Sequence, residues 1–137
     1  MMHDHEQIQP VFVIHGERVK SLEDFYQEIG EAVNGPGGYF GANLDALWDC
    51  LRGGFGTPEE GGYTIRWLNC KASQQALGYE ETVRQLDDRL KQCHPASQEQ
   101  VQRDITRARH HEGPTAFDWL VDLLRQAKMF GAELELH

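Results

Sequence analysis

Gly38–Leu51 has the sequence GYFGANLDALWDCL. Its glycines and aromatic pair predict a loop. Asn43 is then placed to cap a short helix, because an asparagine oxygen can accept a hydrogen bond from an unpaired amide of the first turn. At 100° per residue, Leu44, Leu47 and Leu51 fall on one face of that helix. We therefore expect a short amphipathic helix that packs on the core through its leucines.

Two carboxylates, Asp45 and Asp49, lie four residues apart on the neighbouring face, beside Trp48. Like charges at this spacing repel by roughly 0.2–0.5 kcal/mol. The helix dipole favours Asp45 in the first turn regardless of function, whereas Asp49 lies further along and gains little from it. Two interpretations stay open at this point: a solvated acidic face, and a surface that recognises a positively charged partner.

The whole run closely resembles the signature of the barstar family, the small intracellular inhibitors of secreted bacterial ribonucleases. Weaker similarity extends to Phe12–Val19, to the helix that follows, and to the end of the chain around Arg125–Lys128 and Gly131. It does not extend to the stretch 69–112. The resemblance implies an α/β fold with a three-stranded parallel sheet packed by helices. It also implies a protein that blocks the active site of a ribonuclease.

By motif position, the resemblance implies that Asp49 enters the phosphate-binding centre of the nuclease and that Asp45 supports it. It implies that Tyr39 packs against a catalytic side chain, and that Trp48 braces the helix and borders the contact. For Tyr39 and its neighbour Phe40, packing onto the core as loop residues is the alternative. The expected partner-binding residues are Tyr39, Phe40, Asn43, Asp45, Trp48, Asp49, Gln126 and Phe130.

Several positions depart from the family pattern. Gln126 and Phe130 occupy positions in the last helix that resemble acidic contacts of the family. Gly54 stands where the best-known member has an aromatic residue, and Ala42 replaces an acidic residue of the loop. These departures predict a different cognate nuclease, docked on a similar acidic helix but with other contacts at the rim.

The composition is that of an acidic, single-domain protein. The chain has 137 residues, with 22 acidic and 13 basic side chains and a formal net charge of −9. This balance argues against direct nucleic-acid binding and favours salt-sensitive association with a basic protein. The chain has neither an apolar run that could span a membrane nor a recognisable secretory signal. Cys50, Cys70 and Cys93 are expected to be reduced thiols of a cytoplasmic protein.

Three strands are predicted outside the acidic helix. Val11–Ile14 is a continuous apolar run typical of a strand buried on both faces, and Tyr63–Leu68 is rich in β-formers. Ala132–Leu136 alternates like a strand with one wet face. Ser21 and Thr115 are predicted to cap the helices that follow them. Strands separated by helices favour a parallel sheet with right-handed crossovers.

The stretch 69–112 is expected to be a helical insertion between the second and third strands. Tyr79–Leu90 has a narrow apolar stripe at helical spacing, and a second helix is predicted after Ser97. The two helices are expected to pack on the body through these stripes. The alternative is that they contact a partner or a second copy of the chain. Residues 1–10 are predicted to be a mobile tail before a single domain at 11–137.

Patterns for other functional classes are weaker. His110-His111-Glu112 suggests metal ligands, but adjacent histidines diverge on a helix, whereas helical ligand pairs usually sit three or four residues apart. The sequence contains no hydrolase or nucleotide-binding motif. We therefore expect neither enzyme activity, nor a metal, nor a cofactor. A hydrolase using Asp45 and Asp49 is the enzymatic alternative.

The function expected from the sequence is that of a cytoplasmic immunity protein within a toxin–antitoxin pair. Its expected partner is a basic ribonuclease toxin. The sequence does not fix the oligomeric state, and a monomer or a 1:1 complex with the toxin is expected. The alternative is a barstar-like interaction module whose partner is not a nuclease.

Overall fold

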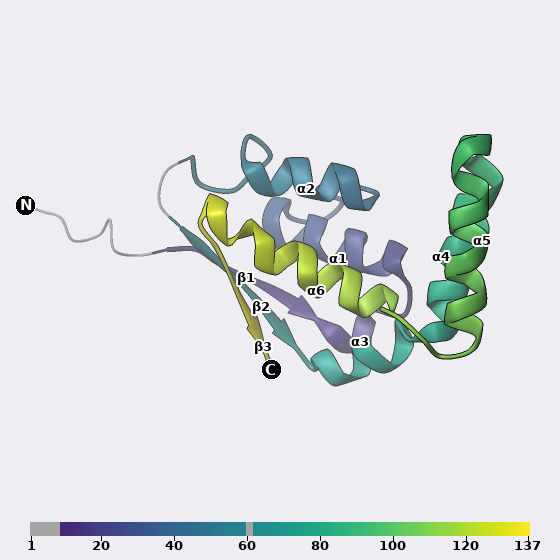
Figure 1. The fold of residues 1–137 in the computed structure, drawn as a ribbon. Helices are drawn as coiled ribbons and strands as arrows, with labels where there is room; N and C mark the ends of the chain where they lie inside the picture. Colours follow the sequence, from purple (N-terminus) through teal and green to yellow (C-terminus); the bar gives the residue numbers. More distant parts are fainter. Residues whose placement is uncertain (1–8, 60–61) are drawn as a thin grey trace, which may run out of the picture.

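The computed structural model describes residues 9–59 and 62–137, and its strands form one three-stranded parallel sheet (Figure 1). The strands are β1 (Val11–His15), β2 (Tyr63–Leu68) and β3 (Ala132–Leu136), with β2 in the centre. Helices connect one strand to the next and supply the long crossovers that parallel pairing requires. The predicted α/β class and all three strands are confirmed.

The predicted tail lies mostly outside the described residues. Of positions 1–10, the structure describes Gln9 and Pro10. The carbonyl of Pro10 accepts a hydrogen bond from Thr64 N at 2.9 Å, so Pro10 already pairs with β2. This pairing lies one residue before the predicted start of the domain at residue 11, where β1 begins.

One face of the sheet is covered by helices and the other is not (Figure 1). The covering helices are α1 (Leu22–Asn34) and α6 (Ala116–Gln126), and α2 (Leu44–Arg52) packs further out against α6 and the 3-10 turn η4 (Ala127–Phe130). The prediction that the first strand is buried on both faces is wrong. Val11 is 42% exposed, because it faces away from the helices.

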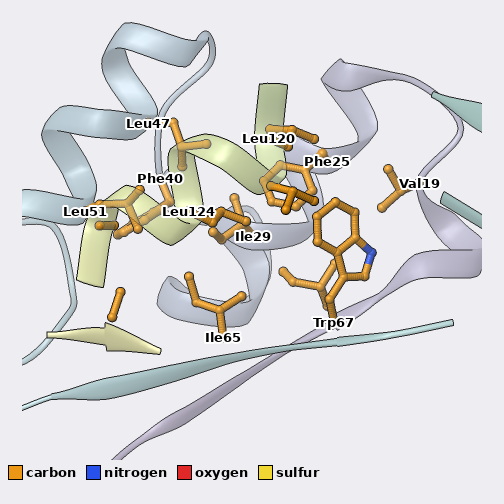
Figure 2. Packing of buried hydrophobic residues seen from close by; sticks show 14 of the residues in the cluster. Val19, Phe25, Ile29, Phe40, Leu47, Leu51, Ile65, Trp67, Leu120 and Leu124 are labelled. Carbon is orange, nitrogen blue, oxygen red and sulfur yellow. The ribbon is translucent and has the colours of Figure 1, made fainter. Parts of the chain in front are cut away.

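The core lies between the sheet and these helices (Figure 2). Trp67 of β2 is fully buried there against Phe25 of α1, with ring centroids 4.9 Å apart. Its indole N–H is not orphaned, because it donates to Ser73 Oγ at 2.9 Å. The Ser73 hydroxyl in turn donates to the carbonyl of Gly16 at 2.8 Å. The buried indole N–H of Trp67 is thus satisfied by Ser73. The same serine links the end of β2 to Gly16, which directly follows β1.

That short helix, α3 (Cys70–Ala76), changes the extent of the predicted insertion. Ser73 and the following Leu77 are buried in the main body. The part that projects from the body is a helical hairpin, α4 (Tyr79–Gln92) and α5 (Gln98–Arg109), joined through the 3-10 turn η3 (Pro95–Ser97) (Figure 1). We call it the α4–α5 hairpin.

The α4–α5 hairpin has a small core of its own. Leu86 of α4 packs with Val101, Ile105 and Ala108 of α5. Both apolar stripes are present, but the prediction that they pack on the body is wrong, because they pack mainly against each other. Trp119 of α6 packs against this cluster and also against the main core. The small core of the hairpin and the main core therefore meet at the side chain of Trp119.

Two side chains at the start of α4 attach the hairpin to the first turns of other helices. The Glu81 carboxylate accepts a hydrogen bond from Leu22 N of α1 at 3.0 Å, and the Thr82 hydroxyl accepts one from Ala116 N of α6 at 2.7 Å. First-turn amides have no partner within their own helix, so these bonds satisfy groups that would otherwise be unpaired. The base of the hairpin is fixed to the body.

Candidate functional site

Helix α2 presents one face to the core and the other to solvent. Asn43 Oδ1 accepts from Ala46 N at 2.8 Å, which confirms the predicted cap. Gly41 before it has φ +96°, and a Cβ there would lie 2.6 Å from the backbone N of Leu47, so only glycine fits. Leu47 and Leu51 are fully buried beneath the helix. The loop and the helix are thereby held in one conformation.

The two carboxylates of α2 lie on the outward face. Asp45 and Asp49 are both exposed, and we call this pair the acidic ridge. Among the residues that the structure describes, neither takes part in an ion pair. Within residues 9–59 and 62–137, nothing covers the two carboxylates, so they are available to an external cation.

The loop before α2 separates two neighbouring aromatic residues. Tyr39 is 54% exposed, whereas Phe40 is completely buried with Leu47 and Leu51 (Figure 2). Phe40 is therefore withdrawn from the predicted contact residues, because a side chain inside the core cannot touch a partner. Its role is to anchor the loop.

Sequence reasoning missed a second exposed aromatic residue, Phe55, in the glycine-rich loop after α2. Its side chain is 46% exposed. Asn34 joins the two loops, because its Nδ2 donates to the carbonyl of Tyr39 at 2.8 Å and to that of Phe55 at 2.7 Å. The signal in the sequence was a single large apolar residue among glycines, with nothing to indicate that it would lie near Tyr39.

The remaining predicted contact residues lie where α2 meets the end of α6. Trp48 and Phe130 pack edge to face, with ring centroids 4.9 Å apart. This contact braces α2 against η4, and both rings are partly buried. Gln126 is exposed nearby and lines the same depression as Asp45 and Trp48.

That depression is a cleft of about 560 Å³ between the α2–α6 surface and the α4–α5 hairpin. We call it the hairpin cleft. Most of its apolar lining comes from α2, α4 and α6, with Ala108 added by α5 and Pro114 by the loop before α6. The residues from the first three helices are Leu44, Trp48, Leu86, Trp119 and Leu123. Asp49 is not part of the lining, so the hairpin stands beside one end of the acidic ridge without closing over it.

Cysteine chemistry does not extend the site. Cys50, Cys70 and Cys93 are all free. Burial, and then the negative charge of Asp49, raise the pKa of the Cys50 thiol above its usual value. Because the thiolate is the reactive form, Cys50 is a protonated, unreactive core residue.

Residues 9–59 and 62–137 contain neither a candidate metal cluster nor a membrane-spanning helix. Over this part of the chain, no three side chains of the metal-binding types gather in a way that could hold an ion. Within the same residues, the helices are too short or too polar to cross a bilayer.

Residues 9–105 match the model of a protein family described as Barstar (barnase inhibitor). The chain belongs to the barstar family. The match covers more than half of the sequence and includes the acidic ridge and most of the α4–α5 hairpin. It therefore runs through much of the stretch 69–112, where we saw no similarity, and stops before α6. Barstar-family proteins are inhibitors of barnase-type ribonucleases rather than enzymes.

Proposed function

We propose that this barstar-family protein is an immunity protein that blocks the active site of a secreted ribonuclease toxin inside the bacterium that makes it. The observation that carries the proposal is the acidic ridge. Asp45 and Asp49 project outward from a helix whose start is capped by Asn43 and whose inner face is buried through Leu47. A fixed pair of negative charges is what a phosphate-binding site is built to receive.

The physical basis is mimicry of RNA. A ribonuclease active site holds its positive side chains ready for a phosphate. A carboxylate on a rigid helix can take the phosphate's place through charge-assisted hydrogen bonds, which are about twice as strong as neutral ones. Because α2 is already ordered, little entropy is lost on binding. Asp49 enters the phosphate-binding centre, and Asp45 supports it from one turn away.

Aromatic side chains complete the contact at the rim. Tyr39 and Phe55 are exposed on two loops joined by Asn34, and they add apolar area beside the ridge. Trp48 borders the contact and is held in place by Phe130. Large aromatic residues next to a charged anchor are typical of the residues that dominate binding energy at protein interfaces.

The test is an RNA-cleavage assay with a panel of purified, secreted bacterial ribonucleases of the barnase type, barnase included. We expect this protein to stop cleavage by at least one of them at an equimolar ratio. Failure to inhibit any member, together with recovery of a partner that is not a nuclease in affinity purification, would establish the alternative of a non-nuclease interaction module.

A further inference from the structure

The hairpin cleft begins where the acidic ridge ends. Asp45 and Trp48 belong to the ridge side of α2 and also line the cleft. A protein seated on α2 would therefore reach the mouth of the cleft without any movement of this chain. The cleft extends the proposed binding surface towards the α4–α5 hairpin.

The cleft combines an apolar floor with an excess of negative charge. Besides Asp45, the carboxylates of Asp104, Glu112 and Asp122 line it, against the guanidinium groups of Arg89 and Arg107. In the part of the chain that the structure describes, none of these four carboxylates forms an ion pair. The cleft therefore suits a cation that lies next to an apolar side chain.

Of the two arginines, Arg89 is engaged within the protein. Its guanidinium lies over the Trp119 ring, 5.6 Å from the ring centroid. The negative face of the ring attracts the guanidinium, so the charge of Arg89 is partly engaged within the protein. The carboxylates on the opposite wall, such as Asp122, keep their capacity to accept hydrogen bonds.

Both walls of the cleft are fixed before any partner binds. The hairpin wall is attached through Glu81 and Thr82 to the first turns of α1 and α6, and through Tyr79, whose hydroxyl donates to the carbonyl of Gly113 at 2.7 Å. The other wall is α2 and α6, which share the main core. A preformed cleft binds at a lower entropic cost than one that must be assembled.

We propose that the hairpin cleft is a second docking site for the ribonuclease. It receives an exposed segment of the nuclease in which a lysine or arginine neighbours an apolar side chain. The inference rests on the proposed function, since it takes the nuclease as the occupant. The acidic ridge blocks the active site, and the hairpin cleft selects nucleases that carry the right segment beside that site.

The test uses the ribonuclease of the panel that this protein inhibits most strongly. This protein and its variants are immobilised, and the association and dissociation rates of that ribonuclease are measured. Asp122→Lys reverses a charge in the cleft at an exposed position of α6, and Glu133→Lys makes the same change on the uncovered face of the sheet. We expect Asp122→Lys to weaken binding at least about tenfold relative to Glu133→Lys, mainly through faster dissociation.

The two proposals fail in different ways. If Asp49→Ala abolishes inhibition while Asp122→Lys binds like Glu133→Lys, the cleft proposal is overturned and the inhibitory function stands. If Asp49→Ala has no effect while Asp122→Lys weakens binding, the cleft is the docking site and the role of the acidic ridge is wrong. If no nuclease in the panel is inhibited, both fail.

A spectroscopic readout locates the contact. In NMR spectra of the labelled protein, the Trp119 indole signal should move when the nuclease is added, and the Trp67 signal, held by Ser73, should not. An unmoved Trp119 signal contradicts the proposal. Sedimentation of the free protein tests the other occupant: a dimer that Asp122→Lys dissociates would mean that a second copy fills the cleft.

Discussion

The two carboxylates of the acidic ridge are expected to contribute unequally to nuclease binding, although they lie on the same helix. Asp49 lies away from the hairpin cleft, on the part of α2 that the proposal places in the nuclease active site, whereas Asp45 lies between the ridge and the cleft. Removing one member of a desolvated charge pair leaves the other charge buried and unpaired. The resulting loss is larger than the net worth of the pair.

We predict that Asp49→Ala weakens binding by about 2–5 kcal/mol, the general cost of removing one partner of a buried charge pair, a rule that rests in part on the barnase–barstar complex itself. Asp45→Ala should cost less. Isothermal titration with the inhibited nuclease measures both, and Glu133→Ala is the matched control, since it removes the same charge from the uncovered sheet face. A loss of affinity below tenfold for Asp49→Ala would contradict its assigned role.

Neighbouring aromatic residues of the loop should respond in opposite ways. Phe40→Ala should lower the free energy of unfolding by about 3–5 kcal/mol, because Phe40 is fully buried. Tyr39→Ala should leave stability almost unchanged and weaken nuclease binding. Urea unfolding and titration of the two variants separate these effects. Equal losses of stability in the two variants would contradict the assignment of Phe40 to the core and Tyr39 to the surface.

The sequence predicted the carboxylates of α2 but not the fate of this aromatic pair. Leucine spacing determines which way α2 faces, so the outward position of Asp45 and Asp49 followed from local pattern. Tyr39 and Phe40 lie in a loop with no period. Which one enters the core depends on the turn at Gly41 and on packing against Leu47, and both of these are tertiary features.

The two helices of the α4–α5 hairpin could be predicted from the sequence, but the way in which the hairpin is attached to the body could not. The spacing of apolar residues predicted α4 and α5, because helical periodicity is visible within a single stretch of sequence. The bonds that fix the hairpin join Glu81 to Leu22 and Thr82 to Ala116, far apart in the sequence. Helix α3 was missed for a related reason: it is short, and its Ser73 is buried through bonds to Trp67 and Gly16.

The attachment at Glu81 should make stability depend on pH. Burial acts to raise the pKa of the Glu81 carboxyl, but the hydrogen bonds from Arg84, Gln85 and Leu22 N outweigh burial, so the pKa lies below its usual value of 4.5. A lowered pKa in the folded state means that the unfolded chain takes up the proton first. The stabilisation is present above pH 4.5 and is lost as the pH falls through the folded-state pKa.

We therefore predict that Glu81→Gln lowers the free energy of unfolding by about 1–3 kcal/mol at pH 7. The difference from the unmodified protein should shrink as the pH falls below 4.5. Urea unfolding across this pH range measures the difference. A gap between the two proteins that stays constant down to pH 3 would mean that the Glu81 carboxylate does not carry the attachment.

The molecule is layered on one side of its sheet. Helices α1 and α6 cover that face, and α2 packs outside them, so the acidic ridge lies on the outermost layer. Alternation in β3 and the helical connections predicted the parallel sheet. The uncovered face was not predicted for β1, because the run Val11–Ile14 is equally apolar at both sets of positions and carries no signal of which set faces solvent.

The net charge of −9 should speed the encounter with a basic nuclease. Long-range attraction is screened by salt, whereas contacts inside a closed interface are screened much less. We predict that raising the salt concentration from about 50 to 500 mM slows association strongly and changes dissociation little. Stopped-flow mixing measures both rates. An association rate constant that does not change with salt would contradict electrostatic steering.

The claim that the acidic ridge replaces RNA in the nuclease active site is tested most directly by competition. A catalytically inactivated form of the inhibited nuclease is saturated with a short single-stranded RNA, and this protein is then titrated in. We predict mutually exclusive binding, in which the apparent dissociation constant rises in proportion to the RNA concentration. A ternary complex of nuclease, RNA and this protein, formed with undiminished affinity, would contradict the claim.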